Sequence, residues 1–361
     1  MTKTNPLLPV WTIVAPAVGW LLLAGRQLHP SAGYTVLLAA GLLGCVIAAV
    51  HHAEVVAHRV GEPFGTLVLA GSVTVIEVGL IVALMLAGGA AAGTLARDTV
   101  FAAAMIILNG IVGLCLVVGG VCFGEQNFRL SGVNAALATL IAIMVLALVL
   151  PNYSTTFPGP VYNRSELGFV SVVSLVLYAT FIFVQTVRHR DYFLPPRGDR
   201  RDMEHAPPPS GRIAAIGVVL LVVCLGAVVI LAKAISPAIE AGVARAGAPQ
   251  ALVGVIVAAI VLMPEGWAAL RAARADRLQT SLNLALGSAL ATIGLTIPTV
   301  AIVSLLTGWT LTLGIDAKSM VLLLLTFVVS ILSLGTGRTT ILQGAVHLFI
   351  FAIYIFETIV V

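Results

Sequence analysis

The chain has 361 residues, of which 60% are hydrophobic and 9% are charged, and its formal net charge is +4. Because charged residues make up about 25% of a soluble globular domain, this composition excludes that class and indicates an integral membrane protein. The basic balance does not indicate a nucleic-acid partner, since most Lys and Arg residues lie between apolar runs, where they determine orientation in the membrane.

Apolar runs recur along the chain at lengths that suit a bilayer, which takes about 20 residues per helical span. Runs this long and continuous predict α-helices, because lipid offers the backbone no hydrogen-bond partners. We therefore expect an all-α polytopic membrane protein with about eleven transmembrane helices. The predicted spans are 10–25, 33–58, 64–89, 99–123, 131–150, 166–187, 213–235, 250–271, 280–306, 317–334 and 340–361.

One segment interrupts this pattern and divides the chain. Residues 188–212 are rich in proline and contain ten Asp, Glu, Lys or Arg residues, a composition that predicts a solvated, mobile linker. We expect an N-terminal tail and first transmembrane helix over 1–32 and a first five-helix repeat over 33–187. The linker over 188–212 is expected in the cytoplasm, followed by a second five-helix repeat over 213–361.

The positions of Lys and Arg predict how the chain enters the membrane. With the N-terminus inside, thirteen of these residues fall on the cytoplasmic side and six on the other side, which favours a cytoplasmic N-terminus. Since each half has an odd number of helices, two related halves would cross the membrane in opposite directions. That is the inverted-repeat arrangement of many secondary transporters.

Two glutamates lie alone in long apolar runs, one in each half. Glu77 is the only ionisable residue of 64–89. Glu265 is the only one of 251–270. A carboxylate within the bilayer costs several kcal/mol and usually lines a path enclosed by protein. Since loss of water favours the protonated acid and a bound cation favours the ionised one, we expect a shared site for cations and protons. The alternative is a structural glutamate bonded to a neighbouring helix.

Further oxygen-bearing side chains near these glutamates are candidates for the same site. Calcium takes six to eight oxygen ligands, more than two carboxylates supply. Thr74 lies one helical turn before Glu77, and polar residues interrupt the helix that follows each glutamate. The alternative role is hydrogen bonding between helices. The additional candidates for binding cations and protons are Thr74, Asn109, Ser281, Asn283 and Ser288.

A second polar group is predicted at the end of the second span. Histidine titrates near neutral pH, so a proton relay or an entrance filter is expected there. The alternative is a polar helix end at the membrane surface. The residues of this predicted entrance are His51, His52, Glu54, His58, Glu62 and, in the second half, Glu240.

Three further ionisable residues are not assigned to the cation site or to the entrance. His347 and Glu357 share the last apolar run, and Glu357 is expected at the membrane interface because it lies four residues from the last position. Asp98 is predicted to be a helix N-cap. No ATP-coupling motif is found, so ion gradients are the expected source of energy.

Two stretches of the chain resemble ChaA-type bacterial cation/proton antiporters of the calcium/cation antiporter superfamily. They comprise HHAE at 51–54, GEPFGT at 61–66 and SVTVIE at 72–77 in the first half, and PEGW at 264–267 and LQTSLNLALGS at 278–288 in the second.

The resemblance implies an eleven-helix secondary antiporter of the bacterial inner (plasma) membrane. Such a protein is not an enzyme and has no cofactor; its partners are inorganic cations, protons and the lipid bilayer. It would export Ca²⁺, and also Na⁺ or K⁺, in exchange for protons, by alternating access. Glu77 and Glu265 would bind cations and protons in turn, and Glu54 and Glu240 would lie near the cytoplasmic entrance.

The sequence also departs from the superfamily pattern. Gly-Asn often precedes each acid, whereas this chain has Val73-Thr74 and Val261-Leu262, and Ala291 stands where many relatives carry Gln. The lost amides leave open an antiporter selective for K⁺ or Na⁺ without calcium transport. Two further functions stay open from the residues: a channel, and a non-transporting membrane sensor or metalloprotein built on the histidines at 51, 52 and 58.

Overall fold

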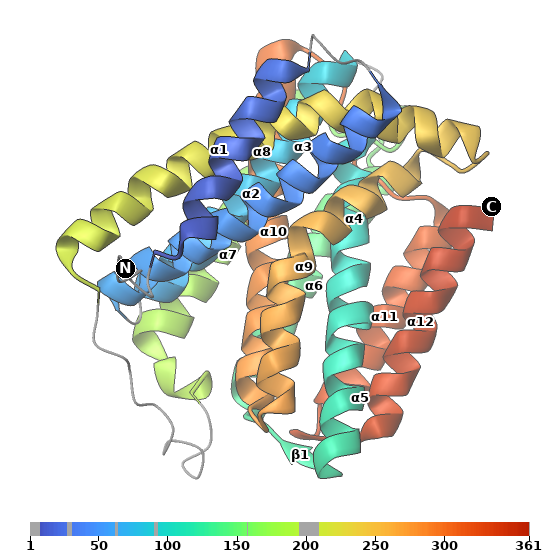
Figure 1. Ribbon diagram of the computed structural model, residues 1–361. Helices are drawn as coiled ribbons and strands as arrows, with labels where there is room; N and C mark the ends of the chain where they lie inside the picture. Colours follow the sequence, from blue (N-terminus) through green and yellow to red (C-terminus); the bar gives the residue numbers. More distant parts are fainter. Residues whose placement is uncertain are drawn as a thin grey trace. The chain divides into compact units, whose positions relative to one another are not determined.

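The computed structural model describes residues 8–26, 31–61, 64–89, 93–156, 158–194 and 209–360. Over these residues the protein is built from long helices, with one short two-stranded pairing. Each of the eleven predicted spans coincides with a helical segment (Figure 1). The predicted all-α polytopic class is therefore confirmed.

The helices form two compact units, each of which draws on both halves of the sequence. The first unit contains α1 (Val10–Gly25), α2 (Ala32–Val60), α3 (Phe64–Gly88) and α8 (Gly211–Arg245). The second unit contains α4 (Leu95–Met105), η2 (Ile106–Ile111), α5 (Val112–Phe123), β1 (Gln126–Asn127), α6 (Leu130–Met144), η3 (Val145–Val149), η4 (Leu150–Tyr153), α7 (Arg164–Phe183), η5 (Val184–Arg188), η6 (Arg190–Tyr192), α9 (Ala251–Arg274), α10 (Leu278–Thr307), α11 (Ala317–Leu334), β2 (Arg338–Thr339) and α12 (Ile341–Val360).

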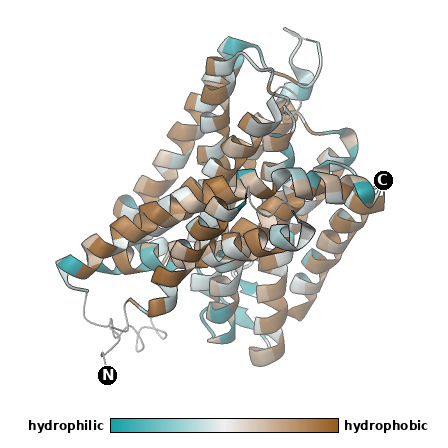
Figure 2. Ribbon diagram, turned by 45° about the horizontal axis from the view of Figure 1, so that its top comes forward, coloured by the Kyte–Doolittle hydropathy of each residue, from teal (hydrophilic) through white to brown (hydrophobic). Residues whose placement is uncertain are grey.

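The surface composition of the helices suits a bilayer. Hydrophobic colours cover the long helices, and hydrophilic colours gather at helix ends and loops (Figure 2). Among the described residues, nine helices are long and apolar enough to cross a membrane, and Val10–Gly25 and Gly71–Leu86 are shorter apolar segments. Large apolar side chains such as Leu332 and Phe349 are each 71% exposed, which is expected of lipid-facing positions.

In the first unit, α2 and α8 pack in antiparallel directions. A Cβ placed on Gly217 of α8 would lie 3.4 Å from Val56 of α2. Further along the pair, Gly19 of α1 contacts both Cys45 of α2 and Leu231 of α8. Small residues at these contacts let the helix backbones approach closely, as is common between membrane helices.

Helix α1 is tied to its neighbours through backbone carbonyls. The hydroxyl of Tyr34 on α2 donates to the Leu22 carbonyl at 2.6 Å. The indole N–H of Trp20 donates to the Val223 carbonyl of α8 at 3.3 Å. The additional N-terminal helix is therefore an integral part of the first unit.

In the second unit, the loops group at two ends, as the alternation of spans requires. At one end, β1 pairs with β2, with Gln126 opposite Thr339, and Gln126 Nε2 donates to Asp276 Oδ1 at 2.6 Å. At the other end, the Thr312 N–H donates to the Gly93 carbonyl at 3.1 Å. These contacts gather three loops at the first end, and the loop after α10 joins the segment before α4 at the second.

The structure describes the first and last residues of the predicted linker. Residues 188–194 belong to the second unit, where Arg129 donates to the Asp191 carbonyl at 2.8 Å. At its other limit, α8 begins at Gly211, with Ser210 as its N-cap. The rest of the predicted connector, 195–208, lies outside the described residues.

Candidate cation site

Helix α3 presents Thr74 and Glu77 on its buried face. Glu77 is 0% exposed and Thr74, one turn earlier, is 3% exposed, whereas Val75 between them is 55% exposed. Because residues three apart share a helix face, the carboxylate and the hydroxyl lie on the same enclosed side. The predicted shared face is therefore present, and a cation-binding role for the two side chains stays a prediction.

Glu265 lies on α9 beside a weakened helical turn. Pro264 is inside the helix, and because proline has no N–H, the carbonyl of Ile260 loses its usual partner. The neighbouring Gly266 packs against η2, since a Cβ placed there would lie 3.2 Å from Ile111. The half-buried Glu265 therefore sits in a turn with a released backbone oxygen, packed against a π-helical segment.

The segment η2 carries Asn109, which is 0% exposed. Its helix was predicted to have a polar break at this point, and the structure has instead a continuous helix widened into π-helical turns. Single π-helical turns are frequent at functional sites. Asn109 Nδ2 donates to Thr326 Oγ1 of α11 at 2.9 Å, and Asn109 Oδ1 lies 3.0 Å from His347 Nδ1 of α12.

Sequence reasoning missed the two partners of Asn109. His347 was noticed as a polar residue in an apolar run and received no role. Thr326 had no distinguishing signal, because isolated threonines are common in membrane helices. Only the packing of α11 and α12 against η2 shows that these side chains meet.

The three candidates on α10 lie in different surroundings. Ser281 is 1% exposed and lies beside the Cys115 thiol of α5, while Ser288 is half-buried. Asn283 accepts from Gln279 at 2.9 Å and donates to the Phe193 carbonyl at 2.6 Å. The Asn283 amide thus ties α10 to the segment after η6, and a cation-binding role for all three stays a prediction.

The predicted entrance residues of α2 do not share one environment. His52 is 0% exposed, and its Nε2 lies 3.1 Å from the Thr12 carbonyl of α1. The ring of His51 is 5.6 Å from that of Trp11, centroid to centroid. His58 is half-buried and Glu54 is exposed. His52 therefore faces the interface between α1 and α2.

The two acids expected at one entrance lie toward opposite ends of the α2–α8 pair. Glu54 lies beside the contact of α2 with Gly217, whereas Glu240 lies beyond Leu231 on the antiparallel α8. Glu240 accepts from Ser236 at 2.7 Å within the same helix. The two acids therefore lie apart along this pair, and an entrance role for each stays a prediction. Glu62 lies outside the described residues.

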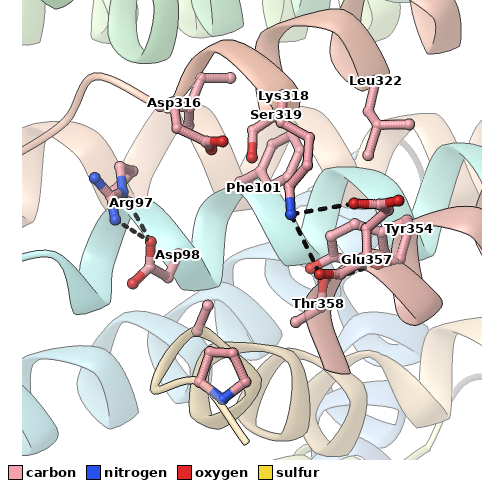
Figure 3. A pocket seen from close by; sticks show the side chains of 13 residues that line it. Arg97, Asp98, Phe101, Asp316, Lys318, Ser319, Leu322, Tyr354, Glu357 and Thr358 are labelled. Atoms are coloured by element: carbon pink, nitrogen blue, oxygen red, sulfur yellow. Dashed lines mark hydrogen bonds and ion pairs between the residues drawn. The ribbon is translucent and has the colours of Figure 1, made fainter. Parts of the chain in front are cut away.

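A separate cavity of about 240 Å³ opens at one end of the second unit (Figure 3). Its charged lining residues include two ion pairs: Arg97 contacts Asp98 at 2.7 Å and Lys318 contacts Glu357 at 3.2 Å. The N-cap prediction for Asp98 was wrong, because α4 begins at Leu95 and Asp98 lies in its first turn. The residues that line this cavity include none of the predicted cation ligands.

An all-α polytopic fold with single carboxylates in apolar helices is typical of membrane proteins that move ions. The family model described as "Sodium/calcium exchanger protein" matches residues 30–187 and 216–360. The chain therefore belongs to the sodium/calcium exchanger family.

Proteins similar over nearly the whole length support this assignment. The chain is 47% identical to y4hA of Sinorhizobium fredii (strain NBRC 101917 / NGR234), an ionic transporter by name, over 96% of this chain and 95% of that protein. It is 35% identical to the sodium-potassium/proton antiporter ChaA of Escherichia coli (strain K12), over 98% and 95%.

Solved structures share the fold at lower sequence identity. The structure of native YfkE has a TM-score of 0.74 and 19% identity, covering 98% of this chain and all of that one. Among proteins of this kind the activity is secondary transport, so the chain is a secondary transporter and not an enzyme. The family assignment also decides against the non-transporting sensor or metalloprotein.

Proposed function

We propose that the protein exchanges a cation for protons by alternating access, with cations and protons competing for Glu77 and Glu265. The observation that carries this proposal is the complete burial of Glu77, at 0% exposure, with Thr74 on the same helix face. An enclosed carboxylate needs either a proton or a cation to offset its charge. The same carboxylate oxygens can then bind either a proton or a cation.

The family comparison supports a second, related half of this site. The same family model matches twice, over 30–187 and 216–360, close to the predicted repeats 33–187 and 213–361. Each matched stretch contains one of the two glutamates. We therefore retain the proposal that two inverted repeats contribute one carboxylate each.

The remaining oxygen ligands would come from groups near each glutamate. Thr74 offers a hydroxyl beside Glu77, and the turn before Pro264 offers a released carbonyl. Broken turns of this type supply cation ligands in discontinuous transporter helices. Asn109 offers an amide oxygen from the segment that packs against the turn of Glu265.

We propose Ca²⁺ as a transported cation, together with Na⁺ or K⁺. A second candidate is an exchanger that moves Na⁺ or K⁺ without calcium. It is favoured by the 35% identity to a relative named a sodium-potassium/proton antiporter. The relative named as a Ca²⁺/H⁺ antiporter, ChaA of Bacillus subtilis (strain 168), is less similar, with 24% identity over 50% of this chain. Thr74 and Leu262 stand where superfamily members often carry the amide of Gly-Asn, and the loss of both amides also favours fewer calcium ligands.

The proposed setting is a bacterial inner membrane with the N-terminus in the cytoplasm. The distribution of thirteen and six basic residues between the two sides supports this orientation.

The test is proton movement in liposomes that contain the purified protein and a trapped pH-sensitive dye. Addition of CaCl₂, NaCl or KCl in turn should drive protons out of the liposomes as the cation enters. Glu77→Gln and Glu265→Gln should each abolish this exchange. A glutamine amide has no negative charge to attract the cation and does not take up or release a proton in its place. Glu357→Gln, the same substitution at the paired acid of α12, is the matched control and should retain exchange.

Wild-type liposomes without cation-driven proton movement would reject the antiporter. Normal exchange by Glu77→Gln or Glu265→Gln would reject the glutamate mechanism. A response to Na⁺ and K⁺ without a response to Ca²⁺ would select the second candidate.

A further inference from the structure

Three polar side chains from three helical segments form a buried cluster in the second unit. Asn109 on η2, Thr326 on α11 and His347 on α12 are each 0% exposed. Burial of polar groups costs free energy unless they are hydrogen-bonded. The positions of their hydrogen atoms can therefore be deduced from the contacts that they make.

The hydroxyl of Thr326 determines the orientation of the Asn109 amide. The single hydrogen of Thr326 Oγ1 is directed to the Leu322 carbonyl at 2.8 Å, a stronger acceptor than the Met105 sulfur at 3.6 Å. Thr326 Oγ1 can then only accept from Asn109, 2.9 Å away. The group of Asn109 that faces Thr326 must be the NH₂, so its carbonyl oxygen faces His347.

The orientation of Asn109 in turn places a hydrogen on His347. The amide oxygen accepts, so His347 Nδ1 at 3.0 Å must donate and must carry the hydrogen. The Leu108 carbonyl, a second acceptor, also faces this ring. In the neutral ring Nε2 then has a lone pair, and it has no hydrogen-bond partner among the described residues.

Glycine residues bring α12 close enough for this contact. A Cβ placed on Gly113 of α5 would lie 2.9 Å from the Cβ of His347. A Cβ on Gly344 of α12 would lie 2.5 Å from the backbone nitrogen of Val117. The seam between α5 and α12 thus holds His347 against the π-helical turn.

We propose that Thr326 and His347 are positioning residues that hold the Asn109 carbonyl in one direction and thereby set how tightly the exchanger binds its cation. The inference rests on the proposed function, since it takes Asn109 as an oxygen donor to that site. One lone pair of Asn109 Oδ1 is used by His347, and the other stays available to a cation. A ligand already oriented loses less conformational freedom on binding.

The position of η2 supports this role. The turn that carries Glu265 packs on the same segment through Gly266 and Ile111. Within the second unit, the segment that carries the oriented amide and the turn that carries the carboxylate therefore pack against each other.

The transport test compares variants that remove the hydrogen bonds with variants that keep them. Thr326→Val removes the oxygen that accepts from Asn109 at nearly constant volume, and His347→Leu removes the donor. Each should raise the KM for the cation roughly three- to tenfold, the range expected from losing one or two hydrogen bonds, with the maximal rate largely kept. Thr326→Ser and His347→Asn, which restore the acceptor and the donor, should return KM toward the wild-type value.

Ser330→Ala is the matched control, because Ser330 is a buried hydroxyl one turn further along α11 and is 1% exposed. It should leave KM unchanged. A wild-type KM in both Thr326→Val and His347→Leu would overturn the inference and leave the cluster as a link between helices.

A second measurement does not depend on transport. Solid-state ¹⁵N NMR of histidine-labelled protein in liposomes should show His347 protonated at Nδ1, with its signal assigned by its loss in His347→Asn. A ring protonated at Nε2 alone would overturn the deduced orientation. Wild-type protein without cation/proton exchange would overturn both proposals, whereas wild-type exchange with unchanged variants would overturn this one alone.

Discussion

The two units each bury a histidine, and the two histidines have different partners. His52 in the first unit and His347 in the second are both 0% exposed within apolar helices. His52 Nε2 lies 3.1 Å from a backbone carbonyl, whereas His347 Nδ1 lies 3.0 Å from a side-chain amide. The partner of His52 is a backbone carbonyl, which any residue at position 12 would provide. The partner of His347 is an amide side chain, which requires Asn at position 109 and Thr326 to orient it.

The difference extends to further ties between helices. In the first unit, Trp20 and Tyr34 also donate to backbone carbonyls. The second unit also uses backbone carbonyls, as between Asn283 and Phe193. It adds pairs in which both partners are side chains: Gln126 bonds Asp276 and Asn109 bonds Thr326. A hydrogen bond to a backbone carbonyl holds two helices together whatever side chain the accepting residue carries. Side-chain ties depend on specific residues, which is what a binding site requires.

The largest expected effect comes from closing the space that brings His347 to Asn109. Gly113→Leu inserts a side chain where a single Cβ would already lie 2.9 Å from His347. Overpacking of this kind costs about 1 to 3 kcal/mol of stability or more. Thermal unfolding should show it as a lowered Tm. Gly168→Leu on α7, where an added Cβ meets nothing within 4 Å, is the control and should keep the Tm.

A second substitution tests the first histidine alone. His52→Leu leaves the Thr12 carbonyl without its buried partner, and such a loss costs about 1 to 3 kcal/mol. We expect a lower Tm and an unchanged cation KM, the opposite of His347→Leu. A changed KM with an unchanged Tm would place His52 in the transport path and remove the contrast between the two histidines.

The pH dependence of transport distinguishes the glutamates from the amide cluster. If protons compete with the cation, the wild-type KM should rise as the pH falls, by up to about tenfold per pH unit for one competing proton. Thr326→Val should multiply KM by the same factor at each pH, because the Asn109 amide does not titrate. A factor that changes with pH would show that the cluster takes part in proton binding.

The smallest effect is expected from removing one hydrogen bond to a backbone carbonyl in the first unit. Tyr34→Phe removes the hydroxyl that donates to Leu22 at 2.6 Å, at a cost of about 0.5 to 1 kcal/mol. The Tm should fall slightly while exchange continues at the wild-type rate. A large loss of exchange would mean that α1 does more than pack against α2 and α8.

The sequence by itself determined the membrane class, the eleven spans and the isolated positions of Glu77 and Glu265. These features depend on local composition, because the free energy of moving a segment into lipid is close to a sum over its own residues. The resemblance to cation/proton antiporters rested on equally local motifs, and the family comparison confirmed it.

Only the tertiary structure decided which side chains meet. Asn109 was predicted as a ligand from its own helix, yet its partners lie 217 and 238 positions away. The opposite placement of Glu54 and Glu240 follows from the antiparallel packing of α2 and α8, and the division into two units separates α8 from the helices that follow it. Hydrogen bonds and close packing depend on distances of a few ångströms between remote segments, which no local pattern of residues records.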